Sequence, residues 1–94
     1  MITRTMSLRD AEALVAGRLP ISTISGHELS LDVFRLSPDG LNWSFVVVPR
    51  RESSRVPVTR KVEVCEFEGG ITEANYRAAH QRAIDWQVAN SGLS

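Results

Sequence analysis

The chain has 94 residues, a length that suits one domain with a single hydrophobic core. Eleven Lys and Arg residues balance eleven Asp and Glu residues, so the formal net charge is zero, and 43% of the residues are hydrophobic. This composition argues against a disordered chain and against a strongly basic nucleic-acid module. We therefore expect residues 1–94 to form one globular domain.

Two features of the sequence bear on localisation. The apolar run from Phe45 to Val48 is far shorter than the roughly 20 residues that a membrane span requires, and the first six residues lack the apolar stretch of a signal peptide. The single cysteine, Cys65, cannot form a disulfide within the chain, which agrees with a reducing compartment. We expect a cytoplasmic protein without membrane contact.

The first predicted element is a helix over residues 8–16. Ser7 is a suitable N-cap, Asp10 favours the first turn, and apolar residues then recur at helical spacing up to Gly17, a natural stop. Leu19-Pro20-Ile21 leaves the helix, and Gly26-His27 is typical of a turn.

Alternating apolar residues predict a strand over 29–36, and Ser37-Pro-Asp-Gly40 is a strong turn signal. The next strand is predicted over 41–48 and is apolar on both faces. Leu41, Trp43, Phe45 and Val47 share one face, whereas Val46 and Val48 lie on the other. Pro49 is expected to end the pairing.

A polar connection over 50–55 leads to a third strand over 56–68, interrupted near Pro57 and followed by a turn at Gly69-Gly70. Thr72 is a suitable N-cap for a last helix, which runs from Glu73 to about Asn90. The prediction is an α+β fold of order α-β-β-β-α, with a three-stranded antiparallel meander and both helices packed on one face. This arrangement buries Trp43 and Trp86.

This element order, with Gly69-Gly70-Ile71-Thr72 leading into an Ala-rich last helix, resembles the double-stranded-RNA-binding domain. The family places lysines at the start of its second helix to grip phosphates. The matching positions here are Glu73 and Ala74, followed by a single cation at Arg77, so the binding signature is missing and we assign no family.

Residues that could carry chemistry are few. The candidate metal ligands His27, His80 and Cys65 lack the short spacings of zinc sites. His80 is expected to be half-buried and hydrogen-bonded near the sheet. Alternation along a strand separates Glu63 from Glu66 and Glu68, so these acidic residues are expected to form a solvated edge rather than an acid/base pair.

No nucleophile elbow, Walker A loop or dinucleotide-binding glycine motif is present, and a short meander is expected to offer little concavity. We therefore predict no enzymatic activity, no metal and no cofactor.

The segment 50–61 is the most unusual in charge. It carries five cations and one carboxylate, Glu52, a net charge of +4 in twelve residues, and the cations are Arg50, Arg51, Arg55, Arg60 and Lys61. The segment is either a solvated loop or a site for phosphates or for an acidic protein surface.

With both helices on one face, Val46 and Val48 would emerge on an uncovered face of the sheet. We therefore predict a small non-enzymatic protein that binds a protein partner through Val46, Val48 and the five cations of segment 50–61. In size and simplicity it is similar to phage- and plasmid-encoded regulators, including anti-CRISPR inhibitors. The alternatives are a nucleic-acid-binding module that uses the basic segment and the sheet, and a homodimerising accessory protein.

Overall fold

A computed structural model describes residues 1–26, 28–37 and 43–89. The elements in chain order are β1 (Ile2–Ser7), α1 (Leu8–Leu14), β2 (Ser22–Ile24), β3 (Leu29–Leu36), β4 (Ser44–Arg51), β5 (Lys61–Phe67) and α2 (Glu73–Ala89). Some predictions fall outside the described residues: the turn residue His27, the turn at 38–40, the strand start at 41–42 and the helix end at Asn90. Neither described helix is long and apolar enough to cross a membrane.

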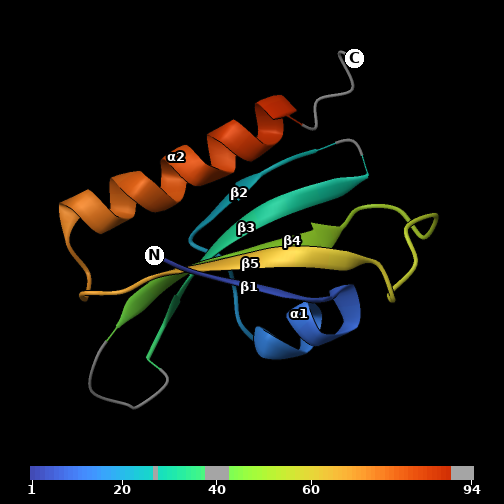
Figure 1. The fold of residues 1–94 in the computed structure, drawn as a ribbon, viewed down its shortest axis with the longest axis horizontal. Coiled ribbons are helices and arrows are strands. Elements are labelled where there is room, and N and C mark those ends of the chain that lie inside the picture. Colours follow the sequence, from blue (N-terminus) through green and yellow to red (C-terminus); the bar gives the residue numbers. More distant parts are fainter. Residues whose placement is uncertain (27, 38–42, 90–94) are drawn as a thin grey trace.

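The five strands form one antiparallel sheet in the order β1-β5-β4-β3-β2 (Figure 1). Its centre is the predicted meander, because β3 pairs with β4 and β4 pairs with β5. The α+β class, the meander and the strand over 29–36 are confirmed. The two edge strands were not predicted: β1 pairs with β5, and the three-residue β2 pairs with β3.

Both helices begin where their caps predict. The hydroxyl of Ser7 accepts a hydrogen bond from the backbone N–H of Asp10 at 3.2 Å, and the hydroxyl of Thr72 accepts one from Asn75 at 3.0 Å. The helix α1 ends at Leu14, two residues before the predicted end, and Gly17 follows with a φ of 77°.

The helices lie on opposite faces of the sheet, α2 above it and α1 below it in Figure 1. Neighbouring residues of β4 show why. Val46 and Val48 belong to the apolar cluster that contains Leu8 and Ala11 of α1, whereas Phe45 and Val47 belong to the cluster that contains Ala79 and Ala83 of α2. The prediction of both helices on one face is therefore wrong. The strand β4 is apolar on both faces because a helix covers each of them.

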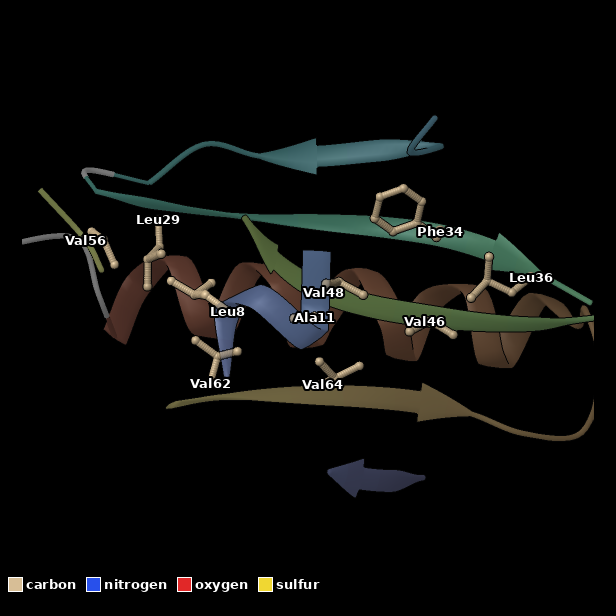
Figure 2. Packing of buried hydrophobic residues seen from close by; sticks show 10 residues of the cluster. All are labelled: Leu8, Ala11, Leu29, Phe34, Leu36, Val46, Val48, Val56, Val62 and Val64. Atoms are coloured by element: carbon tan, nitrogen blue, oxygen red, sulfur yellow. The ribbon is translucent and has the colours of Figure 1, made fainter. Parts of the chain in front are cut away.

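Figure 2 shows the α1 cluster, with Leu8 and Ala11 of α1 among side chains of β3, β4 and β5. All of its core members are less than one-tenth exposed. The resemblance to the double-stranded-RNA-binding domain implies two helices on one face, so it does not extend to this arrangement.

The strand β4 continues through Pro49, contrary to the prediction, and Pro49 stands opposite Leu31 of β3. Pairing of β4 with β5 covers only Phe45 to Val47. Pro49 therefore lies where β4 borders one neighbour, and its missing N–H leaves no gap in a second ladder. The third predicted strand is shorter than expected, since β5 begins at Lys61 and Val56 is a buried residue of the connection before it.

The two tryptophans differ in exposure. Trp43 is 42% exposed, with the Arg35 guanidinium 4.9 Å from the centroid of its ring, so the expectation that it is buried is wrong. Trp86 is partly buried and packs against both apolar clusters.

We expect Trp86→Ala to lower the free energy of unfolding by about 2 kcal/mol, because it removes contacts with two clusters. Trp43→Ala should lower it by less than about 1 kcal/mol, since an exposed cation–π pair contributes little. Urea unfolding of both variants checks this difference, and equal losses would contradict the packing described here.

Candidate functional site

Val46 and Val48 are predicted to bind a partner, but almost none of their surface is accessible. They are 3% and 1% exposed beneath α1. The prediction that they lie on an uncovered sheet face is therefore wrong, because α1 covers that face.

Arg50 and Arg51 are the last residues of β4, and both are ion-paired within the chain. Arg50 Nε lies 2.7 Å from Asp32 Oδ2, and Arg50 Nη2 lies 3.2 Å from Glu52 Oε1. Arg51 Nε lies 3.2 Å from Glu12 Oε1 of α1. Carboxylates of the fold thus already compensate two of the five predicted partner-binding cations.

The other three cations, Arg55, Arg60 and Lys61, are exposed. Their side chains make no ion pair or hydrogen bond with any residue that the structure describes. Arg60 immediately precedes β5, and Lys61 is its first residue. These cations are the part of the basic segment that remains free to meet an anion.

The acidic residues of β5 are separated, as the alternation predicts. Glu63 pairs with Arg82 of α2 at 3.1 Å, whereas Glu66 lies 3.9 Å from Arg4 of β1. Across the described ranges, no group of three His, Cys, Asp or Glu side chains is placed to hold a metal ion.

The ring of His80 lies 4.7 Å from the ring of Tyr76, centroid to centroid. His80 is half-buried, as predicted. Its buried Nε2 has no hydrogen-bond partner among the described residues, so the expected hydrogen bond is not present at that atom.

The structure describes a groove of about 490 Å³ between the end of α1 and strands β3 and β4. We call it the α1 groove. Its volume exceeds the little concavity expected from the sequence and lies within the range of ligand pockets. Its apolar lining residues are Val15, Pro20, Phe34, Val48 and Pro49, and its polar ones are Glu12, Arg18, Asp32 and Arg50.

Asp32 is the least expected residue of this groove, because a carboxylate that is 2% exposed needs hydrogen bonds to offset its desolvation. Thr23 Oγ1 donates to its Oδ1 at 2.8 Å, and Arg50 Nε donates to its Oδ2 at 2.7 Å. Arg50 also donates to Glu52, which accepts a further hydrogen bond from Ser30. The network links β2 and β3 to the end of β4 and holds the polar wall of the groove in place.

Arg18 is the one charged lining residue of the groove whose side chain has no partner in the described part of the chain. Next to it, Leu19 is 89% exposed, and Ile21 in the same connection is 46% exposed. Leu19 is thus an exposed apolar residue between Arg18 and Pro20, two lining residues of the groove. The signal in the sequence was the apolar content of the short connection Leu19-Pro20-Ile21.

Comparison with known proteins gives this site no precedent, since no family model, no curated protein and no solved structure matches the chain.

Proposed function

We propose that this chain is a non-enzymatic binding protein that acts by protein–protein contact, as a regulator or inhibitor of a larger assembly would. The observation that carries the proposal is the α1 groove beside the exposed Leu19. A concave apolar site edged by solvent-exposed apolar side chains is typical of surfaces that bind a protein segment.

The charges of the groove favour a particular partner. The carboxylates of Glu12 and Asp32 are already paired with Arg51 and Arg50, whereas Arg18 is free to bind. The proposed partner segment therefore inserts an apolar side chain between Val15 and Phe34 and places a carboxylate near Arg18.

A further observation supports this choice over the nucleic-acid alternative. Binding of nucleic acid by the basic segment is weakened because Arg50 and Arg51 are compensated within the fold. The cysteine is a buried free thiol, which agrees with the proposed location in the cytoplasm.

The test compares capture of a partner by matched variants from nuclease-treated and untreated extracts of the native host. Leu19→Asp places a charge at the rim of the groove and should weaken capture by roughly thirtyfold, equivalent to about 2 kcal/mol. Val88→Asp is the control, because Val88 is also exposed, at 69%, but lies on α2. Both variants should unfold like the wild type.

We expect to capture a partner protein even after nuclease treatment. The Val88→Asp variant should still capture this partner, whereas the Leu19→Asp variant should not. Loss of all bound material after nuclease would favour the nucleic-acid alternative instead. Capture that is insensitive to both nuclease and Leu19→Asp would place the contact on another surface, and recovery of a second copy of the chain alone would favour homodimerisation.

A further inference from the structure

A second concavity lies on the other face of the sheet, beside α2. We call it the α2 cavity. It has a volume of about 320 Å³ and lies between the second half of α2, the starts of β3 and β5 and the middle of β4. Its floor is apolar, with Leu31, Val47 and Cys65 all 2% exposed or less. Trp86 of α2 also lines it.

The polar lining of this cavity is dominated by cations. Arg60, Lys61 and Arg82 contribute to it, against the single carboxylate of Glu63. Arg82 Nη2 already lies 3.1 Å from Glu63 Oε2, so these two charges compensate each other. Arg60 and Lys61 have no counterion in the described structure, which leaves two uncompensated positive charges beside an apolar floor.

Two exposed cations alone are ordinary solvated side chains. Their position at a cavity with apolar lining residues lets them bind an amphipathic anion. The apolar part of such a ligand is buried in the cavity, and its anionic group stays at the solvent side beside the cations. A charge-assisted hydrogen bond to an ammonium or guanidinium is stronger than one between neutral groups. The volume is at the small end of known ligand pockets.

We propose that the α2 cavity binds a small organic carboxylate whose apolar body has about the size of one ring. The apolar body packs against Trp86, the apolar lining residue that is not fully buried, and the carboxylate lies between Arg60 and Lys61. The α1 groove lies on the opposite face of the sheet and shares one lining residue, Pro49, with this cavity. The proposed site also gives a role to the two free cations at the end of the basic segment.

The experiment titrates the full chain carrying Trp43→Phe, in which Trp86 is the only tryptophan and reports on the cavity. The ligands are cyclohexanecarboxylate and its neutral analogue cyclohexylmethanol, which share the ring and differ in charge. The carboxylate should change Trp86 fluorescence saturably, with a dissociation constant of about 1 mM or below. The alcohol should bind at least about fivefold more weakly.

Matched charge removals then locate the anion. Lys61→Gln should weaken carboxylate binding by about threefold to tenfold and leave alcohol binding unchanged. Arg55→Gln removes another exposed cation of the same segment that does not line the cavity, and should change neither ligand's affinity.

The proposal is overturned if neither fluorescence nor calorimetry detects carboxylate binding up to about 10 mM. It is also overturned if the alcohol binds as tightly as the carboxylate, because the cavity is then merely apolar. Equal losses from Lys61→Gln and Arg55→Gln would overturn it too, since the attraction would then come from net charge alone.

Discussion

Val48→Asp is expected to unfold the protein rather than to weaken a binding surface. Val48 is 1% exposed in the cluster beneath α1, so the new carboxylate would be buried without a designed partner. A buried unpaired charge costs at least about 4 kcal/mol. A domain of this size has a total stability of about 5 to 14 kcal/mol, so a loss of this size removes most of the stability at the lower end of that range.

Circular dichroism and urea unfolding measure this effect directly. Val88→Asp makes the same change at an exposed position of α2 and should alter the free energy of unfolding by less than about 0.5 kcal/mol. A Val48→Asp protein with the wild-type urea midpoint would show that α1 does not cover this face, and would restore the open sheet surface that the sequence predicts.

The features that could be predicted are those set by neighbouring residues. Ser7 and Thr72 cap their helices through hydrogen bonds that span three residues, and the strand over 29–36 follows from its own alternation. Capping hydrogen bonds and strand alternation involve only residues that are close together in the sequence.

The features that could not be predicted depend on contacts between distant residues. Each helix has an apolar side, but the sequence of α1 does not indicate which face of the sheet the helix covers. The apolar residues on both faces of β4 indicate that both faces are covered. The prediction instead left the face of Val46 and Val48 uncovered. The strand β1 was missed because Thr3, Arg4 and Thr5 lack an apolar face, as suits an exposed edge.

In the candidate site, too, some features follow from neighbouring residues and others depend on distant contacts. The charge of segment 50–61 is evident in the sequence, but Asp32 and Glu12, which pair with Arg50 and Arg51, lie 18 and 39 residues away. Asp32 between Leu31 and Val33 was the available signal, because a carboxylate in an apolar strand needs a counterion. Only the register identifies that counterion, since Val48 stands opposite Asp32 and Arg50 follows on the same face.

Arg50→Ala is accordingly expected to destabilise the fold by about 3 kcal/mol. It leaves the Asp32 carboxylate, 2% exposed, with Thr23 as its one remaining side-chain partner among the described residues. Removing one member of a buried ion pair costs about 3 to 5 kcal/mol, and the lower end applies because the Arg50 side chain is 49% exposed and water can enter in its place. Urea unfolding of the purified variant measures the loss.

A double-mutant cycle with Asp32→Asn separates this pair from other effects of Arg50. In the Asp32→Asn background no buried charge remains, so Arg50→Ala should cost about 1 kcal/mol or less, a coupling of about 2 kcal/mol. Arg55→Ala is the matched control and should stay within about 0.5 kcal/mol of the wild type, because Arg55 is exposed and has no ion pair with a described residue. If Arg50→Ala were as mild as Arg55→Ala, the ion pair would contribute nothing to the fold, and Arg50 would be free to bind the partner that the sequence assigns to it.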